Sequence, residues 1–360
     1  TDDEQQASGI MVVSGKALQR NASALQDLLD DTTRSARFDE RERIRELLAL
    51  LTSRKVQSVA GNGHGLAMSA ASQGLGPVSR LAYRTSGLEG LQRLVDLDTR
   101  LQDEQALNAF CEQLAALYDK IRRQPVAVLN VADEVHLDAF NALARDRFLG
   151  HGQQQVASAF SLPGCREHGS LAWIINTQVN FCALAFASVP GGHPDAPALT
   201  VLGHFLRNEY LHQAIREKGG AYGSGASQNN GEAVFRFYSY RDPRLEETIR
   251  DFRRSIEWFL ESSHDPTLLE QAILGVVSSL DKPRSPAGEA KHAYHSAWFG
   301  QGEHYQDAFR QGVLRLTLDD LQRVAQVYLL DQPCSVAVVG GDGSRARLEA
   351  MGLQINRLRV

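Results

Sequence analysis

The sequence of 360 residues has only four cysteines, and they lie far apart, at Cys111, Cys165, Cys182 and Cys334. No C-x-x-C pair occurs, so the cysteines indicate neither a structural zinc cluster nor the dense disulfide framework of a small secreted domain. Four unpaired thiols fit a reducing compartment, such as a bacterial cytoplasm or an organelle matrix.

Long apolar runs and an excess of basic charge are also missing. No run of about 18 apolar residues is present, so the sequence predicts no transmembrane helix. Lys and Arg number 38 against 43 Asp and Glu, a net charge of −5. Because nucleic acids and anionic membranes select basic surfaces, we expect neither as a partner. The chain opens on Thr1-Asp2 with no Met and no apolar leader, so we expect a piece of a longer protein, or a processed one.

Several catalytic motifs are absent. Neither His-x-x-Glu-His nor His-Glu-x-x-His occurs, and without two such histidines and a carboxylate base the chain cannot assemble a zinc hydrolase site alone. No Gly-x-Ser-x-Gly elbow and no phosphate-binding P-loop are present. Glu289, His292 and His295 are spaced i, i+3, i+6, which a helix aligns only partly. We interpret them as a surface cluster and predict no metal ligands in this chain.

An internal repeat is the clearest feature that is present. Residues 124–131 read QPVAVLNV and residues 332–339 read QPCSVAVV, 208 positions apart, each after an amphipathic helix. These β-branched runs predict buried strands. Upstream, strands are predicted at 10–13 and 233–240, each followed by two helices and a segment rich in small residues.

The two halves differ in one respect. About 65 residues, roughly 165–230, have no counterpart in the first half, which is the pattern expected if the first unit lacks its opening strands and helix. We therefore predict an α+β fold with two related domains, the first truncated at its N-terminus. Residues 1–150 form the first domain, the polar segment 151–168 is a linker, and residues 169–360 form the second. An incomplete sheet has unpaired edges, so self-association is expected there.

The stretch from Asp195 to Pro243 has the most candidate functional residues. A helix is predicted to about Lys218, with an apolar stripe at positions 199, 202, 206, 210 and 214. Gly219-Gly220 ends it, and Ala221-Tyr222-Gly223-Ser224-Gly225 follows. Such glycines let a backbone approach a ligand closely, but they equally suit a helix stop followed by a bulged strand.

A family resemblance bears on this choice. The run LHQAIREKGGAYG at 211–223, followed by FYSYRDP at 237–243, resembles the last domain of the presequence-protease branch of the pitrilysin/insulinase family. The run VSGKALQRN at 13–21 looks like the later part of that family's third domain. The resemblance extends over nearly the whole chain.

The resemblance implies a fold, an activity and partners. Family members are zinc metallopeptidases built from four related α+β domains, whose two halves close around a chamber. This chain would be the non-catalytic C-terminal half, inactive alone, paired with an N-terminal catalytic half that binds zinc, and acting on unstructured peptides. Arg216 and Tyr222 match residues that contact the peptide near the metal. Both are donors suited to the oxygen on which negative charge develops. Asn180 and its strand would pair with extended substrate by β-addition.

Two alternatives stay open. Taken alone, Arg216 also suits a surface ion pair with Glu217 or Glu209. The chain also suits a metal-free partner subunit, or a peptide-binding module, that pairs with a separate catalytic chain. The missing opening of the first unit argues against a natural subunit, which should have complete domains.

Overall fold

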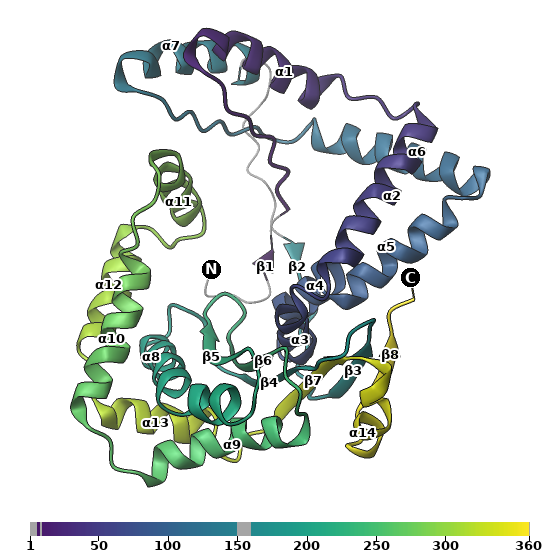
Figure 1. The fold of residues 1–360 in the computed structure, drawn as a ribbon. Helices are drawn as coiled ribbons and strands as arrows, with labels where there is room; N and C mark the ends of the chain where they lie inside the picture. The colour runs from purple at the N-terminus through teal and green to yellow at the C-terminus, as the bar shows by residue number, and fades with distance from the viewer. Residues whose placement is uncertain (1–5, 8, 150–159, 360) are drawn as a thin grey trace.

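The computed structural model describes residues 6, 7, 9–149 and 160–359, shown in Figure 1. In the second unit (residues 160–359), a mixed six-stranded sheet has the strand order β5-β6-β4-β7-β3-β8. Strand β4 is antiparallel to both β6 and β7, whereas β3 is parallel to β7 and β8. The strands are β3 (Ser170–Ile174), β4 (Phe181–Ala187), β5 (Gly223–Asn229), β6 (Val234–Tyr240), β7 (Cys334–Gly340) and β8 (Gln354–Arg357). The strands predicted at 233–240 and 332–339 are confirmed as β6 and β7.

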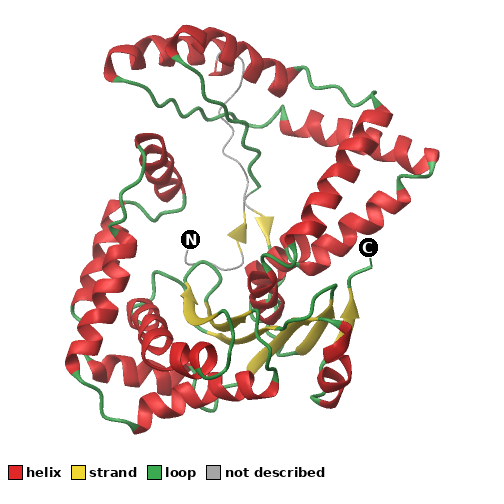
Figure 2. Ribbon diagram, viewed as in Figure 1, coloured by secondary structure: helices red, strands yellow, loops and turns green. Residues whose placement is uncertain are grey.

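Helices of the second unit bury one face of this sheet, as Figure 2 shows. Val336 and Val338 of β7 point into the resulting core, together with Phe205, Phe237 and Phe252. The helical elements are α8 (Ala196–Leu206), a π-helix (Arg207–Glu217), α9 (Glu246–Glu261), α10 (Pro266–Leu280), α11 (Pro286–Trp298), α12 (Glu303–Leu314), α13 (Leu318–Tyr328) and α14 (Arg345–Ala350).

Helices of the first unit (residues 9–149) bury the opposite face. Helix α3 lies across β4, β6 and β7, because its small side chains, such as Ala67 and Ala70, let it approach Ala337 and Val339 closely. The indole N–H of Trp173 donates to the hydroxyl of Tyr83 on α4 (2.9 Å). The helices of this unit are α1 (Ala22–Arg34), α2 (Arg41–Ser58), α3 (Gly63–Ser72), α4 (Pro77–Ser86), α5 (Leu88–Arg100), α6 (Glu104–Ile121) and α7 (Glu134–Ala144).

The first unit has no sheet of its own in the described ranges. The strands predicted at 10–13 and 124–131 are not formed, and both segments run without regular structure. Their apolar side chains remain exposed, for example Val12 at 67% and Val126 at 53%. The physical reason lies in the second unit, where the corresponding strands β6 and β7 both pair with β4 and not with each other. Residues 9–149 offer no strand in the place of β4, so the sheet edge expected to drive self-association is absent from them.

Side-chain caps begin two helices of the second unit. Helix α10 begins at Pro266, and the Asp265 side chain accepts the backbone N–H of Thr267. Helix α13 begins after Thr317, which forms a reciprocal capping box with Asp320. These caps satisfy N–H groups that have no partner inside the helix.

The predicted linker lies partly outside the described residues. Within it, β2 (Phe160–Ser161) pairs with β1 (Gln6–Ala7). All four cysteines are free thiols. No helix in the described ranges combines the length and the apolar character needed to cross a bilayer.

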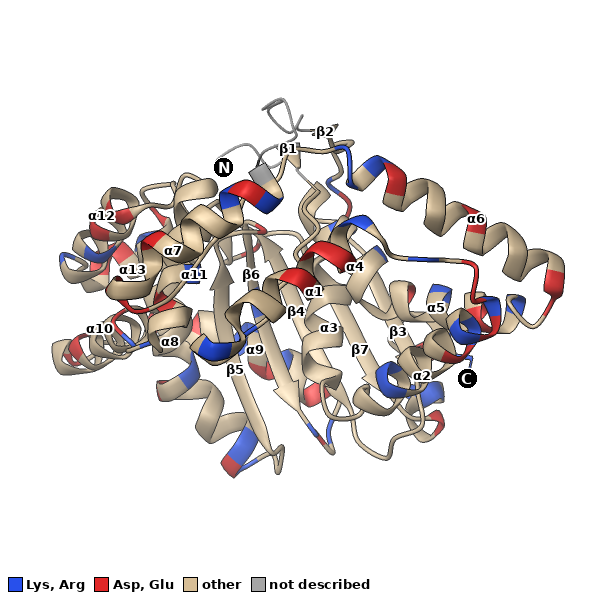
Figure 3. Ribbon diagram, turned by 90° about the horizontal axis from the view of Figure 1, so that it is seen from above, with Lys and Arg blue, Asp and Glu red and all other residues tan. Residues whose placement is uncertain are grey.

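Charged residues of both signs are interspersed on the helices, as Figure 3 shows. Many pair within one helix, such as Arg34 with Asp30 (2.7 Å) and Arg345 with Glu349 (2.9 Å). Exposed pairs of this kind contribute about 0–1 kcal/mol each. The two buried faces of the sheet therefore hold the fold together.

Gly63 tests the contact between the two units. A Cβ at this position would lie 2.4 Å from the Phe181 ring, which is fully buried. We expect Gly63→Ala to lower the free energy of unfolding by about 1–3 kcal/mol, because overpacking forces the ring or α3 to move. Gly61→Ala is the control, since its Cβ would meet only the Ser58 carbonyl oxygen at 3.6 Å. Equal urea midpoints for the two variants would contradict this packing.

Candidate functional site

A glycine turn joins the π-helix to strand β5. Gly220 has φ +79°, and its N–H donates to the Arg216 carbonyl (3.0 Å). The N–H of Ala221 donates to the Ile215 carbonyl (3.1 Å), and that of Tyr222 donates to the Tyr240 carbonyl (3.0 Å). The left-handed φ suits glycine. The turn thus places Tyr222 immediately beside the end of β6, six residues after Arg216.

The Tyr222 side chain lies on an aromatic shelf, formed by Tyr240, Tyr238 and His64. It is 69% exposed and meets the Tyr240 ring edge-on, with centroids 5.6 Å apart. The Arg241 guanidinium lies 5.4 Å from the Tyr240 centroid. His64, from α3, packs edge-on against Tyr240 (4.9 Å) and lies tilted against Tyr238 (5.6 Å). The ring of Tyr222 is therefore held against Tyr240, while its hydroxyl makes no hydrogen bond to any described residue.

Arg216 lies in a short polar chain on the π-helix. Its Nη1 lies 3.3 Å from Nε2 of His212, and Nδ1 of His212 lies 3.3 Å from a carboxylate oxygen of Glu217. A neutral imidazole satisfies both contacts if Nδ1–H donates to Glu217 and Nε2 accepts from Arg216. The alternative of a surface ion pair between Arg216 and Glu217 is thus replaced by contacts of both residues with His212. The other guanidinium N–H groups of Arg216 make no hydrogen bond to the residues that the structure describes.

The π-helix changes the predicted buried stripe. An α-helical period predicted Tyr210 and Ala214 on the core side, where both pack as partly buried side chains, and Leu211 and Ile215 beside them are fully buried. Hydrogen bonds from i to i+5 widen each turn, so the residue below Leu206 is five positions on and not four. The helix was predicted in the right place, but the α-helical period missed the two most deeply buried residues of its second half. His204 also lies on the packed side, where burial lowers the pKa of its imidazole.

Asn180 has a structural role. Its side-chain amide donates to the Arg244 carbonyl (3.1 Å), and its Oδ1 accepts from the Ser344 hydroxyl (2.7 Å). Strand β4, which follows it, is paired along both edges. Substrate therefore cannot add to the sheet at Asn180 as predicted, because no free backbone edge exists there.

The sheet edge beside Tyr222 is β5. It pairs with β6 on one side and has no strand on its other side within the described ranges. Ser224 and Gly225 show why glycine and small residues occur here. The Ser224 hydroxyl donates to the Leu211 carbonyl (3.0 Å), and a Cβ at Gly225 would lie 2.8 Å from the Tyr238 hydroxyl oxygen. Close packing against the π-helix and β6 holds this edge in place.

The sequence analysis assigns no role to Tyr238, Tyr240 or His64. The two tyrosines lie within the FYSYRDP run, and His64 belongs to the other unit. Tyr238 and Tyr240 share the i, i+2 spacing that places both on one face of a strand, which is the one signal that could have found them.

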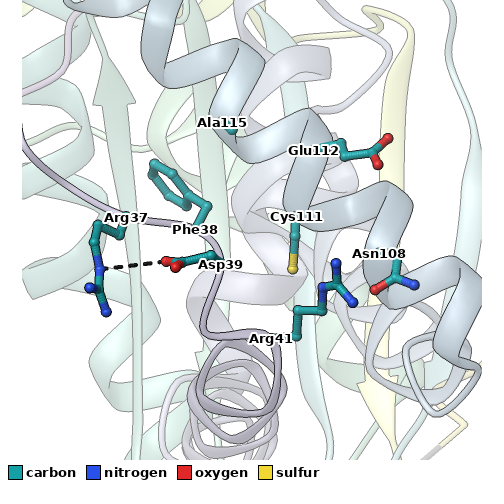
Figure 4. A pocket seen from close by; sticks show the side chains of 8 residues that line it. All are labelled: Arg37, Phe38, Asp39, Arg41, Asn108, Cys111, Glu112 and Ala115. Carbon is teal, nitrogen blue, oxygen red and sulfur yellow. Dashed lines mark ion pairs between the residues drawn. The ribbon is translucent and has the colours of Figure 1, made fainter.

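No group of three or more His, Cys, Asp or Glu side chains that could hold a metal ion occurs among the described residues. A hollow in the first unit, shown in Figure 4, lies between the segment 37–41 and α6. Its lining includes the ion pair of Arg37 with Asp39 (3.5 Å) and the buried Cys111. It contains none of the predicted site residues.

Two family profiles match the chain. One describes a region associated with peptidases of family M16, subfamily C, and matches residues 1–97. The other, PreP C-terminal domain, matches residues 170–338. The mitochondrial presequence protease of Yarrowia lipolytica is 29% identical over 332 residues, covering 91% of this chain and 33% of the relative. That of Emericella nidulans is 31% identical over 363 residues, covering 96% of this chain and 34% of the relative.

Solved structures agree on the fold. A peptidase M16 inactive domain from Pseudomonas fluorescens has a TM-score of 0.60 at 12% identity, covering 95% of this chain and 77% of the neighbour. Pitrilysin has a TM-score of 0.58 at 14% identity, covering 91% of this chain and 34% of pitrilysin. The chain belongs to the pitrilysin family and corresponds to the C-terminal, presequence-protease-like portion of its members. It spans about a third of the length of the relatives named above.

His64 gives the shelf a predictable pH dependence. Burial lowers the pKa of His64, and its Nδ1 is buried with no hydrogen-bond partner among the described residues. The unfolded chain therefore binds this proton more tightly, so stability is complete above about pH 6.5 and falls as the pH drops through that value. We expect His64→Phe to flatten the decline in urea midpoint between about pH 6.5 and 5.

The control is His304→Gln, which removes an exposed imidazole on α12 and should leave the wild-type slope unchanged. Part of the slope should persist in His64→Phe, because burial also lowers the pKa of His204. An identical pH profile for His64→Phe and the wild type would contradict a destabilising protonation at the shelf.

Proposed function

We propose that this chain is the non-catalytic half of a zinc metalloendopeptidase that degrades unstructured oligopeptides. The observation that carries the proposal is the exposed Tyr222 at the beginning of the free edge of β5, which a glycine turn joins to the end of the π-helix that carries Arg216. Ordinary packing does not require a large aromatic side chain that is two-thirds exposed, held by a ring contact and adjacent to the free edge of a strand. A surface that binds a peptide does require such an exposed and rigidly held side chain.

The two side chains suit the carbonyl oxygen of a peptide bond. A phenolic O–H donates one hydrogen bond, and a guanidinium donates several in a planar fork. Placed against the oxygen on which charge develops during hydrolysis, such donors stabilise the transition state more than the substrate. The His212 contact would hold Arg216 in one orientation and lower the entropy lost when it binds.

The edge of β5 explains a preference for unstructured peptides. An extended peptide can add its backbone to a free strand edge, whatever its side chains, whereas a folded protein has no free backbone to offer. The segment GSGASQN in β5 is small and polar, so side chains of many kinds would fit beside it. This edge takes the place of Asn180 as the proposed site of strand addition.

Zinc would be bound by other residues of the complete enzyme. The described part of the chain has no cluster of side chains that fits a metal, so this half would supply the chamber wall and the contacts to the peptide. The catalytic residues would belong to an N-terminal half of the same protein, with residues 1–150 as the later part of a third domain and residues 169–360 as the fourth. The named relatives are mitochondrial, which favours an organelle matrix over a bacterial cytoplasm.

A second candidate is a metal-free partner subunit that pairs with a separately encoded catalytic chain. The similarity to a peptidase M16 inactive domain, of which this chain covers 77%, favours it.

Substitution of the two donors tests the assignment in the complete enzyme. We expect Arg216→Ala and Tyr222→Phe each to lower turnover of an unstructured peptide by about 10²- to 10³-fold, as the loss of one transition-state donor typically does. Urea midpoints should stay unchanged, because both side chains are exposed. Arg254→Ala on α9 and Tyr210→Phe on the π-helix are matched controls. Wild-type turnover in both site variants would remove the assigned role.

Reconstitution tests whether hydrolysis requires a catalytic half in addition to residues 1–360. Residues 1–360 alone should hydrolyse no peptide and bind no stoichiometric zinc, as measured by a fluorogenic peptide assay and by metal analysis. Activity should appear only with a polypeptide carrying the catalytic half. If that half is encoded upstream in the same reading frame, the single-chain enzyme is supported; if it is a separate gene product, the partner subunit is. Peptidase activity of residues 1–360 alone would contradict both.

A further inference from the structure

Arg241, the residue that directly follows strand β6, has an unusual backbone conformation. Its φ is +51°, in the left-handed region that residues other than glycine rarely adopt. Ala233 and Asp331 also have a positive φ, but both lie in turns that precede a strand. A residue held in this region is strained, and the strain persists only where the surrounding structure fixes the backbone.

The residues on either side fix the backbone of Arg241. The Tyr240 carbonyl accepts the N–H of Tyr222 (3.0 Å). Asp242 and Asn180 exchange backbone hydrogen bonds in both directions, each of 2.8 Å. Glycine would adopt this conformation without strain, yet the sequence has arginine here. The side chain therefore needs a reason other than the shape of the backbone.

Packing does not supply that reason. The Arg241 side chain is exposed, and its guanidinium lies 5.4 Å from the centroid of the Tyr240 ring. The Tyr222 ring meets the same Tyr240 ring, with centroids 5.6 Å apart. The guanidinium and the Tyr222 phenol therefore flank one ring of the aromatic shelf. A cation beside a partly exposed ring contributes little to stability, but the contact restricts where the guanidinium lies.

The positive charge of Arg241 has no carboxylate partner among the described residues. Its neighbour Asp242 is fully buried, and the carboxylate accepts the Thr248 hydroxyl (2.7 Å). Glu217, an exposed acid at the end of the π-helix, contacts His212 instead (3.3 Å). The acids that are nearest in the chain are thus committed elsewhere.

Two further cations lie on the turn that packs beside Arg241. A Cβ at Gly220 would lie 3.6 Å from the Pro243 ring, so this turn lies against the segment that follows β6. Arg216 and Lys218 are exposed and form no ion pair with a carboxylate in the part of the chain that the structure describes. The chain as a whole has a net charge of −5. A local excess of positive charge on such a protein attracts a negatively charged ligand.

We propose that Arg241 binds a carboxylate of the peptide, beside Tyr222. This inference rests on the proposed function, because the peptide is the one that adds to the free edge of β5. A guanidinium offers pairs of N–H groups in one plane that match the two oxygens of a carboxylate. The carboxylate is either an acidic side chain of the peptide or its C-terminal group.

Such a contact would give the edge of β5 a property that it lacks by itself. Backbone hydrogen bonds to a strand edge do not read sequence, so they allow a peptide to bind in several registers. One ion pair at a fixed place favours a single register. Arg241 would thus select which peptide bond lies beside Tyr222 and Arg216, which makes it a specificity-determining residue.

Matched peptides test the pairing in the complete enzyme. One unstructured peptide is made with Gln replaced by Glu at each position in turn, and with its C-terminus as the acid or the amide. The KM should be about 10-fold lower for the member whose carboxylate reaches Arg241. A preference for one Glu position identifies a side chain as the source, and a preference for the acid over the amide identifies the C-terminus.

Three variants connect the preference to Arg241. Arg241→Gln should bring the two members of the selected pair to within about 2-fold, by raising the KM of the carboxylate member. Arg241→Lys should keep part of the preference, because the charge stays while the planar fork is lost. Arg254→Gln is the matched control on α9, at another exposed arginine, and should keep the preference of the wild type.

The strained backbone gives a second measurement. Arg241→Gly should lose the preference without lowering the urea midpoint, because glycine adopts a φ of this sign without strain. An arginine required for folding would behave in the opposite way. A lower urea midpoint for Arg241→Gly, together with an unchanged preference, would assign Arg241 to folding and not to the peptide.

Two other results would overturn the inference. One is an equal KM of the wild type for every member of the peptide set, and the other is a full preference in Arg241→Gln. If the complete protein cleaves no peptide, the same comparison is made with dissociation constants from fluorescence anisotropy. A carboxylate preference that depends on Arg241 in a protein without hydrolysis would count against the peptidase proposal alone.

Discussion

Pairing along both edges of β4 is the interaction on which the rest of the structure depends. The strand joins β6 to β7, two segments that lie about a hundred residues apart in the sequence. Helices α9 to α13, which lie between them in the sequence, are thereby attached to one sheet. Both faces of β4 are buried, one by α8 and α9 and the other by α3. Sequence that resembles strand is thus not enough: the run at 126–131 has the same pattern as β7 and stays without regular structure, because a strand needs a neighbour for its backbone groups.

The same pairing links the first unit to the candidate site. Because α3 lies flat on β4, β6 and β7, it brings His64 against the two tyrosines that follow each other along one face of β6. Tyr222 then rests on Tyr240 from the open side. Residues from both units therefore determine how the Tyr222 ring is held, although the glycine turn that carries it belongs entirely to the second.

Much of the second unit could be predicted from local chemistry, since caps and buried strands are specified by near neighbours. Asp265-Pro266 and Thr317 began helices as their side chains require. The π-helix could not be predicted, because the α and π periods differ by less than one residue per turn over so short a run. The burial of Leu206, Leu211 and Ile215 fits the wider turn, but only the structure reveals that turn. Asn180 was misjudged for a different reason: its motif position is unchanged, but the strand edge it was expected to offer is already occupied by β6 and β7.

Two tyrosines show why exposure, and not residue type, marks the candidate functional side chain. The Tyr83 hydroxyl is buried and accepts the indole N–H of Trp173, and burial raises the pKa of Tyr83 to about 12. The hydrogen bond of that hydroxyl to Trp173 holds α4 against the sheet. Tyr222 has the same chemistry, but its backbone is fixed by β6, its ring by Tyr240, and its hydroxyl by nothing in the described chain. A polar group that is held rigidly but left without a partner loses little entropy when a ligand arrives, so the free energy of its new hydrogen bond goes into binding.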